Sequence, residues 1–483
     1  MPDSPIHFGT SGWRAIIADE FTFPNVRLAV TAIAQHVRAK SKKPVIIVAH
    51  DTRFFAEEFA RTAGEILSAH EIEVLFCDGP TPTPTVAVEI RRRKTAGAIN
   101  FTASHNPFAY QGLKFSGPDG APAMPEVTKD IEKRAGKLSK RDFTKSAEAH
   151  SQPKQQFTQI SPRDEYLKRI NELVRFDVIA KAAKSSKDKL AIVYDALHGC
   201  AAGYLDRALA DHGVPVTVIR ANRDVLFDGT GPDVTEENLA PLRKAVLDGK
   251  AHMGLATDGD ADRFGIIDSD GTWISPNHIL ALVYDYLIHS RGWKMDAGRS
   301  VATSHMIDAV AKLNGKKVHQ TPVGFKYIGE LIEEDKIALG GEESAGLSIR
   351  GHVPEKDGIL ACLLVAEMMA ARGTSLAAQI KDLFRRVGSE FWPIRANLHL
   401  SPELQAQTMK RLKQNYSTFL GRHVKSLDRT DGLKLEFDDG SWVLLRLSGT
   451  EPLLRVYTEA GSQKESAKIA DDAQKWINDT SAK

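Results

Sequence analysis

The chain repeats one order of secondary structure three times, and this repetition most constrains how it can fold. In each repeat, short apolar runs rich in β-branched residues alternate with stretches of helical periodicity, in the order strand, helix, strand, helix, strand. The predicted strands cover residues 45–48, 72–76 and 97–100, then 190–193, 214–219 and 252–255, then 300–302, 316–318 and 337–339; the predicted helices cover residues 56–69, 85–93, 203–211, 237–247, 306–313 and 325–333. This alternation predicts three related α/β domains with mixed, mostly parallel sheets.

A different order begins near residue 391. The predicted strands there cover residues 394–400, 433–437, 442–447 and 453–458, and the predicted helices cover residues 402–419 and 463–477. This pattern is typical of a small α+β domain. A chain of 483 residues is long enough for three or four cores at roughly 100 to 200 residues each. We therefore expect domains at residues 1–155, 156–272, 273–388 and 389–483.

The balance of charged residues and the length of the apolar runs argue against two classes of binding partner. The chain has 64 Lys and Arg against 62 Asp and Glu, with no long block of one sign, so it lacks the basic footprint of a nucleic-acid-binding protein. The most apolar run, residues 359–371, is shorter than the roughly 20 residues of a membrane span and contains Glu367. We expect neither nucleic acid nor a membrane as a partner, and no pattern in the sequence predicts an oligomeric state.

The three cysteines indicate a reducing compartment. Cys77, Cys200 and Cys362 are far apart and show no C-x-x-C spacing, which argues against a disulfide framework or a zinc site. We expect a cytoplasmic protein.

Polar loops follow the last predicted strand of all three repeats. They are TASHNP at residues 102–107, DGDADR at 258–263 and GEESAG at 341–346. Ligands of α/β sheets bind beyond the carboxyl ends of the strands, so loops in this equivalent position are the candidate functional sites.

DGDADR places Asp258, Asp260 and Asp262 at alternate positions, which suits a hard cation with oxygen ligands, and Mg²⁺ is the natural candidate. A calcium-binding helix loop is excluded, because it needs glycine at its sixth position and an acidic residue at its twelfth, where this chain has Arg263 and Ser269. Two alternatives stay open: the D-x-D of phosphatases in which an aspartate is the nucleophile, and a solvated acidic turn.

TASHNP presents Ser104 between Ala103 and His105, so that its hydroxyl could act as a nucleophile or carry a phosphate. His105 could be a general base. The alternative for both residues is structural, with the serine capping a helix or satisfying the backbone and the histidine bonding within the loop.

Two further segments carry groups that recognise ligands. RLSGTEPLLR, at residues 446–455, forms a predicted turn between strands whose N–H groups, hydroxyls and arginines could converge on a phosphate. GEESAG places Glu342 and Ser344 where they could bind sugar hydroxyls. The alternatives are a hairpin turn with exposed arginines and a surface turn with a solvated Glu343.

Six motifs in this order resemble the α-D-phosphohexomutase superfamily, which contains the phosphoglucomutases and phosphomannomutases. They are FGTSGWRA at residues 8–15, TASHNP with GLKF at 112–115, DGDADR, GEESAG, GHVPEKDG at 351–358 and RLSGTEPLLR. The resemblance covers essentially the whole chain and implies four domains around a central cleft, the fourth binding phosphate.

The resemblance also implies roles for individual residues. Ser104 carries a phosphoryl group, and a phosphoserine oxygen with Asp258, Asp260 and Asp262 holds one Mg²⁺. Arg14 and Arg263 offset the dense negative charge. Lys114 is the implied general acid and base, with a pKa lowered among cations, and His105 is the second candidate for that role.

The remaining implied residues bind substrate. The non-reacting phosphate of a phosphosugar is held from the fourth domain, and the sugar from the third. The phosphate ligands are Arg446, Ser448, Gly449, Thr450 and Arg455; the sugar-side ligands are Lys326, Glu342, Ser344, His352 and Lys356.

We therefore expect a Mg²⁺-dependent phosphoglucomutase that interconverts glucose 1-phosphate and glucose 6-phosphate through glucose 1,6-bisphosphate. GEES resembles glucose-type mutases, whereas SGTEP is frequent in bacterial mannose and glucosamine enzymes, so a phosphomannomutase or a dual-specificity mutase is the alternative. Ala15, where glycine is common, and Gln111, where asparagine or aspartate is usual, depart from the family pattern. A catalytically silent sugar-phosphate sensor and a metal-dependent phosphatase are the other hypotheses.

Overall fold

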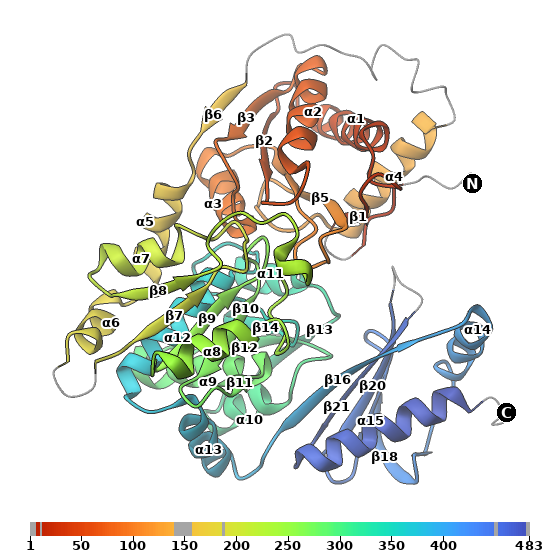
Figure 1. The fold of residues 1–483 in the computed structure, drawn as a ribbon. Helices are drawn as coiled ribbons and strands as arrows, with labels where there is room; N and C mark the ends of the chain where they lie inside the picture. The colour runs from red at the N-terminus through yellow and green to blue at the C-terminus, as the bar shows by residue number, and fades with distance from the viewer. Residues whose placement is uncertain (1–5, 10–11, 140–156, 186–188, 449–452, 480–483) are drawn as a thin grey trace.

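The computed structural model describes residues 6–9, 12–139, 157–185, 189–448 and 453–479. Its named strands form four sheets, one in each predicted unit. Figure 1 shows the first unit at the top, the second and third together in the middle, and the fourth at the lower right.

The first unit is a six-stranded sheet in the order β1-β5-β4-β2-β3-β6, in which β2, β3, β4 and β6 run parallel and β5 turns back antiparallel to β4. Its elements are β1 (Trp13–Ile16), α1 (Phe23–Lys40), β2 (Val45–His50), α2 (Ala56–Ala69), β3 (Glu73–Cys77), α3 (Thr83–Arg93), β4 (Gly97–Phe101), β5 (Tyr110–Ser116), α4 (Pro125–Ser139) and β6 (Thr158–Ile160).

The second unit has five strands in the order β11-β10-β9-β7-β8, with β7, β8 and β9 parallel and β10 antiparallel to β9. Its elements are α5 (Arg163–Leu173), α6 (Phe176–Ala183), β7 (Ile192–Asp195), α7 (Leu205–Asp211), β8 (Val216–Ile219), the 3₁₀ turn η3 (Phe227–Gly229), α8 (Ala240–Asp248), β9 (Met253–Thr257), β10 (Phe264–Asp268) and β11 (Trp273–Ile274).

The third unit has four strands in the order β13-β12-β14-β15, and again only the strand after the last parallel one, β15, is antiparallel. Its elements are α9 (Pro276–Arg291), β12 (Asp296–Ser300), α10 (Met306–Leu313), β13 (Val318–Thr321), α11 (Phe325–Glu333), β14 (Ile337–Glu342), β15 (Gly346–Ile349), α12 (Gly358–Arg372) and α13 (Leu376–Val387).

The fourth unit is an antiparallel sheet in the order β16-β21-β20-β19-β18-β17, covered by helices. Its elements are β16 (Trp392–His399), α14 (Pro402–Arg411), β17 (Thr418–Phe419), β18 (Arg422–Asp428), β19 (Leu433–Phe437), β20 (Trp442–Leu447), β21 (Leu453–Ala460) and α15 (Gln463–Asn478). The predicted α/β fold class is confirmed.

The three candidate loops occupy one structural position. Each connects the last parallel strand of its sheet to an antiparallel neighbour: β4 to β5, β9 to β10 and β14 to β15. The sequence placed the loops at the ends of the parallel strands but did not predict the returning strands. Because both flanks of each loop are paired in a sheet, the loops are held at both ends.

The apolar run at residues 359–371 forms a core helix. α12 begins at its N-cap Asp357, whose side chain accepts the N–H of Leu360, and ends at Gly373 with a positive φ of 63°. It packs within a core that the second and third units share. In the part of the chain that the structure describes, no single helix is long and apolar enough to cross a membrane; α12 and α13 pass that test only as a pair bent by 78°.

Several predicted elements are wrong in extent; the strand expected at 316–318, for example, lies at Val318–Thr321. The helix expected at residues 402–419 ends at Arg411, and Thr418–Phe419 form the edge strand β17. The strand expected at 300–302 lies at Asp296–Ser300, because that segment pairs with both β13 and β14. Val301 and Ala302 instead pack against Trp442, Leu444 and Tyr457 of the fourth unit.

Candidate active site

The loop after β4 holds Ser104 in an unusual backbone conformation. Its φ of 54° is in the left-handed region, which non-glycine residues rarely adopt. The Ser104 N–H donates to Thr102 Oγ1 at 2.9 Å, and the Ser104 hydroxyl donates to Asp258 Oδ2 at 2.8 Å. His105 Nδ1 lies 3.3 Å from the same hydroxyl. The fold therefore brings the predicted nucleophile of the first unit onto the acidic loop of the second.

Asp258, Asp260 and Asp262 form a buried cluster in the loop after β9. Each offers a carboxylate oxygen within 4.8 Å of the others, and all three side chains are almost fully buried. Burial raises the pKa of Asp258 well above its usual range, and the charges of Asp262 and Asp260 raise it further. Burial acts on Asp262 in the same direction, but Lys114, Lys356 and Arg263 outweigh it and hold its pKa well below the usual range.

This cluster fits a divalent cation. Asp260 Oδ1 and Asp262 Oδ1 are buried and accept no hydrogen bond from any residue that the structure describes. Leaving carboxylate oxygens buried without partners is costly, and a hard cation is the group that oxygen ligands at this spacing bind. The three predicted metal ligands are thus brought together, beside the Ser104 hydroxyl.

Two lysines face the cluster. Lys114 Nζ on β5 donates to Asp260 Oδ2 at 2.5 Å and to Asp262 Oδ2 at 2.8 Å. Lys356 Nζ lies 3.2 Å from Asp262 Oδ2 and 3.0 Å from Glu355 Oε1. Burial lowers the pKa of Lys114, but Asp260 and Asp262 outweigh it and leave the pKa raised. The expectation of a lowered pKa is wrong here, because the nearest charges are carboxylates rather than cations.

Arg14, Arg263 and His105 lie around the serine and metal loops. Arg14 Nη1 on β1 donates to Asn106 Oδ1 at 2.8 Å, which ties the serine loop to the edge of the sheet. The backbone N–H of Arg263 donates to Asp258 Oδ1 at 3.0 Å. Burial, together with Arg263 and Arg14, lowers the pKa of His105 well below its usual range.

The sugar loop after β14 contributes two glutamates in different environments. Glu342 Oε1 accepts the N–H of Gly324 at 2.7 Å, and burial together with the charge of Glu343 raises the pKa of Glu342 to about 7. Glu343 Oε2 accepts the hydroxyls of Ser300, at 3.0 Å, and Thr303, at 3.3 Å. Glu343 is therefore bonded to residues of its own unit. This differs from the alternative interpretation, which expected a solvated Glu343.

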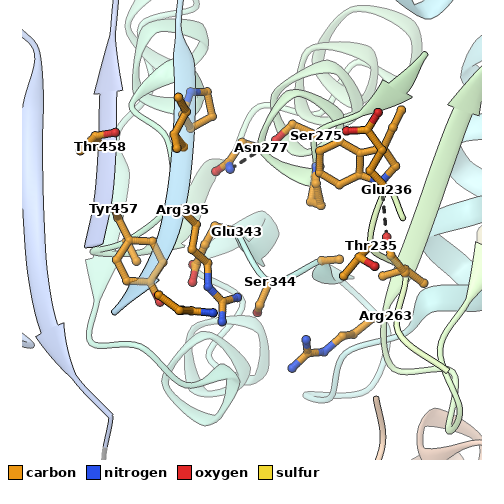
Figure 2. Close-up of a pocket in the computed structure, with 18 of the residues that line it drawn as sticks. Thr235, Glu236, Arg263, Ser275, Asn277, Glu343, Ser344, Arg395, Tyr457 and Thr458 are labelled. Carbon is orange, nitrogen blue, oxygen red and sulfur yellow. Dashed lines mark hydrogen bonds between the residues drawn. The ribbon is translucent and has the colours of Figure 1, made fainter. Parts of the chain in front are cut away.

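A cavity of about 480 Å³ opens beside this loop, between the second, third and fourth units. Ser344, Glu343 and Arg263 line it, as do Arg395 of β16 and Tyr457 of β21. Figure 2 shows Arg395 extending past Tyr457 toward Ser344, with Arg263 on the opposite side. The cavity is large enough for a small polar ligand and has arginines on two walls.

The other predicted substrate ligands lie in different surroundings. Lys326 is the second residue of α11, and burial lowers its pKa against the opposing charge of Glu126 in the first unit. His352 Nε2 lies 2.8 Å from Asp357 Oδ2 and is buried with it, so the ring braces the N-cap of α12. Lys356 contacts Asp262 of the metal loop, whereas His352 contacts Asp357 at the start of α12.

The predicted phosphate loop lies between β20 and β21. Arg446 and Arg455 are opposite each other across these strands, and Arg446 Nε lies 2.8 Å from Asp431 Oδ2. The Ser448 N–H donates to Leu453 O at 2.9 Å. Like charges placed opposite each other repel, and the Asp431 carboxylate offsets part of this repulsion at Arg446. Gly449 and Thr450 lie outside the described residues.

Comparison with known proteins identifies the family. Four models of the phosphoglucomutase/phosphomannomutase family match in sequence: α/β/α domain I at residues 5–142, domain II at 164–271, domain III at 275–387 and the C-terminal domain at 398–475. The chain belongs to this family. It is a phosphohexomutase, an intramolecular phosphotransferase of the isomerase class.

Named relatives of the mutase differ in sugar. A "Phosphoglucomutase/phosphomannomutase" of Thermococcus kodakarensis is 29% identical over 468 residues, with 95% of each chain covered. A "Probable phosphoglucosamine mutase" of Methanothermobacter thermautotrophicus is 29% identical over 477 residues, with 98% of each chain covered. A crystal structure of a candidate phosphomannomutase from Thermus thermophilus is 30% identical and superposes with a TM-score of 0.85 over 99% of this chain and 100% of that one.

Sequence reasoning missed residues that shape the mutase site. Thr83, at the start of α3, donates its hydroxyl to Asp260 Oδ2 at 2.5 Å and its N–H to Asp260 O at 2.9 Å. Asn100 Nδ2 donates to Thr83 Oγ1 at 3.1 Å. Neither residue belongs to a motif, and Arg395 is an isolated arginine in a strand, so no local signal indicated them.

Proposed function

We propose that the protein is a phosphoglucomutase that carries a phosphoryl group on Ser104 and interconverts glucose 1-phosphate and glucose 6-phosphate through glucose 1,6-bisphosphate. The observation that carries the proposal is the contact of the Ser104 hydroxyl with Asp258, inside a cluster of three buried carboxylates and beside Lys114. A cytoplasmic location stays a prediction, and the three buried free cysteines agree with it.

In the first transfer, the bond between Ser104 Oγ and phosphorus breaks and a bond forms from phosphorus to the free hydroxyl oxygen of the sugar phosphate. The hydroxyl proton leaves through Lys114, the proposed acid and base, and a proton returns to Ser104 Oγ. The bisphosphate then reorients, and the other phosphoryl group passes back to Ser104 by the same steps in reverse. Ser104 and the three aspartates would hold a divalent cation, which would supply positive charge to offset that of the phosphoryl group.

Substrate binding is shared between the third and fourth units in this proposal. The non-reacting phosphate is held by residues of the fourth unit: Arg446, Ser448, Gly449, Thr450 and Arg455. The sugar is bound by Glu342, Ser344, Lys326 and Lys356, and His352 supports this side of the site indirectly, through Asp357 at the N-cap of α12. Because the phosphate-binding residues are separate from the sugar-binding residues, one site can accept a nearly symmetric bisphosphate in either orientation.

The preference for glucose is the finer part of the proposal. Glu343 stands at the position where glucose-type and mannose-type patterns differ, and its carboxylate is fixed on Ser300 and Thr303 beside the cavity. A fixed carboxylate discriminates sugars better than a mobile one, because an unmatched hydroxyl cannot be accommodated by moving it.

The first test is initial-rate kinetics with Mg²⁺ and glucose 1,6-bisphosphate, comparing kcat/KM for glucose 1-phosphate, mannose 1-phosphate and glucosamine 1-phosphate. We expect a preference for glucose of at least about tenfold, or about 1.4 kcal/mol. Glu343→Gln should reduce that preference. Glu236→Gln, on the wall of the same cavity but paired with Arg243, is the matched control. Near-equal values would make the enzyme a dual-specificity mutase, and release of inorganic phosphate would indicate a phosphatase.

A further inference from the structure

The serine loop depends on a buried arginine that takes no part in the proposed chemistry. Ser104 keeps its left-handed conformation only if the surrounding structure imposes it, because that conformation is unfavourable for a residue with a Cβ. Arg53 follows β2, lies under the loop and is fully buried.

All four terminal hydrogen bonds of Arg53 go to backbone oxygens of this loop. Nη1 donates to Pro107 O at 2.8 Å and to Tyr110 O at 3.0 Å. Nη2 donates to Ser104 O at 2.7 Å and to Asn106 O at 2.5 Å. The bond to Ser104 O fixes the peptide plane that follows the serine, and this sets the ψ angle of Ser104. Together, φ and ψ direct the Ser104 side chain toward Asp258.

The guanidinium is itself held in place by its neighbour Asp51. Asp51 Oδ1 accepts the N–H of Arg53 at 2.9 Å, and Asp51 Oδ2 lies 3.2 Å from Arg53 Nε. The carboxylate thus engages the inner edge of the guanidinium and leaves both terminal nitrogens for the loop. A lysine could not replace this arrangement, because its ammonium is a single point with three donors rather than a planar fork.

The second unit closes over the same segment. The ring of Phe227 in η3 lies 5.1 Å from Arg53 Cζ. Arg223 donates to Thr52 O at 2.9 Å and to Arg53 O at 3.2 Å, and Thr52 Oγ1 donates to His198 O at 2.8 Å. The arginine that shapes the serine loop is therefore fixed by residues from both units whose loops meet at Ser104 and Asp258.

We propose that Arg53 is a positioning residue of this mutase: it locks the backbone of residues 104–110 so that the Ser104 hydroxyl is aimed at the metal loop, and Arg223 and Phe227 make this lock depend on docking of the second unit. The proposal rests on the proposed role of Ser104. The terminal hydrogen bonds of Arg53 go to the serine loop and none goes to an aspartate of the metal loop, so its contact with the site is made through the serine loop, while Asp260 and Asp258 act on it through charge.

The test compares Arg53→Lys with Arg291→Lys in the full-length enzyme. Arg291 is a matched control because it is a largely buried arginine that pairs with a carboxylate, Glu367, and donates to a backbone oxygen, Leu173 O, away from the site. For Arg53→Lys we expect kcat to fall about 10- to 100-fold while KM changes by less than about threefold. Phosphorylation of Ser104 by glucose 1,6-bisphosphate, followed by intact mass, should slow by the same factor. Arg291→Lys should lower the melting temperature without this kinetic split.

Hydrogen exchange gives a readout that does not require activity. The amides of Ser104, Asn106 and Tyr110 are bonded within the loop, and Arg53→Lys should speed their exchange at least about tenfold while β14 and β15 keep theirs. If wild-type Ser104 never accepts a phosphoryl group, the proposed function fails, and loop exchange still decides the role of Arg53.

Arg223→Gln keeps the test decisive if Arg53→Lys does not fold. Arg223 is exposed and its loss leaves the guanidinium of Arg53 present but less firmly held, so we expect a smaller fall in kcat, about two- to tenfold, with a correspondingly smaller loss of loop protection. The proposal is overturned if Arg53→Lys folds and both its kcat and its loop exchange equal those of the wild type. If Arg53→Lys does not fold, the same result in Arg223→Gln overturns the proposal.

Discussion

At the scale of single residues, Ser104 concentrates most of the proposed chemistry. Its hydroxyl donates to Asp258 and its backbone is held in a conformation that favours glycine. Ser104→Ala keeps the Cβ and removes only the oxygen. We expect mutase turnover to fall by on the order of 10³-fold or more, because Ser104 Oγ is the hydroxyl of this loop that contacts Asp258, while glucose 1-phosphate still binds. Coupled-assay kinetics and calorimetric titration measure the two quantities.

Ser139→Ala, at the exposed end of α4, is the control for this substitution and should leave both turnover and binding unchanged. Full turnover in Ser104→Ala would exclude the phosphoserine and favour an aspartate of the metal loop as the nucleophile.

At the scale of elements, the N-terminus of α12 links the second and third units. Asp357 caps this helix, and the hydroxyl of the fully buried Tyr166 on α5 donates to Asp357 Oδ2 at 2.8 Å and Oδ1 at 2.9 Å. Tyr166→Phe removes these bonds from a buried carboxylate, which should lower the free energy of unfolding by about 1.5–3 kcal/mol. Chemical denaturation followed by fluorescence measures the change.

Tyr416→Phe is the control, because the Tyr416 hydroxyl donates to Arg411 O near the surface, where water can replace the lost bond. We expect a loss below about 1 kcal/mol there. Equal losses in the two variants would show that the cap contact at Asp357 contributes nothing specific.

At the scale of the whole molecule, a buried lysine lies where the fourth unit meets the third. Lys434 Nζ on β19 donates to Val301 O at 2.8 Å and to His305 Nε2 at 2.9 Å, and lies 3.9 Å from the centre of the Trp442 ring. Burial, aided by Arg299, lowers the pKa of Lys434 to about 7, against the opposing charges of Glu459, Asp308 and Asp428.

The sign of the resulting pH dependence follows from the two states of Lys434. An unfolded lysine titrates near 10.4, so between about pH 7 and pH 10 the unfolded chain binds more protons than the folded one. The contribution of Lys434 to stability is therefore unfavourable at and below pH 7 and improves as pH rises. We expect the melting temperature of wild type to fall less between pH 7 and pH 9 than that of Lys434→Met, measured by calorimetry.

Lys425→Met, on the exposed face of β18, should leave the wild-type pH profile unchanged. The same pH profile in Lys434→Met as in wild type would contradict the assignment of this titration to Lys434.

Particular elements show why part of the fold could be predicted. The helices at residues 56–69, 306–313 and 325–333 were predicted with the bounds that the structure has, because each is amphipathic and ends where its periodicity ends. β12 was misplaced, since Asp296–Ser300 has little strand propensity and pairs only because β13 and β14 flank it. The domain boundaries at 155, 272 and 388 stay predictions.

The sequence by itself determined the order of elements, the three equivalent loops and the chemical groups they carry, because periodicity and motif chemistry are local properties of the chain. Only the tertiary structure decided that Ser104 meets Asp258, that Lys114 faces carboxylates rather than cations, and that Arg53 grips the serine loop. Each of these contacts joins residues far apart in sequence. The hydrogen bonds of Arg53 go to backbone oxygens, which every residue possesses. Such partners leave no pattern in a sequence.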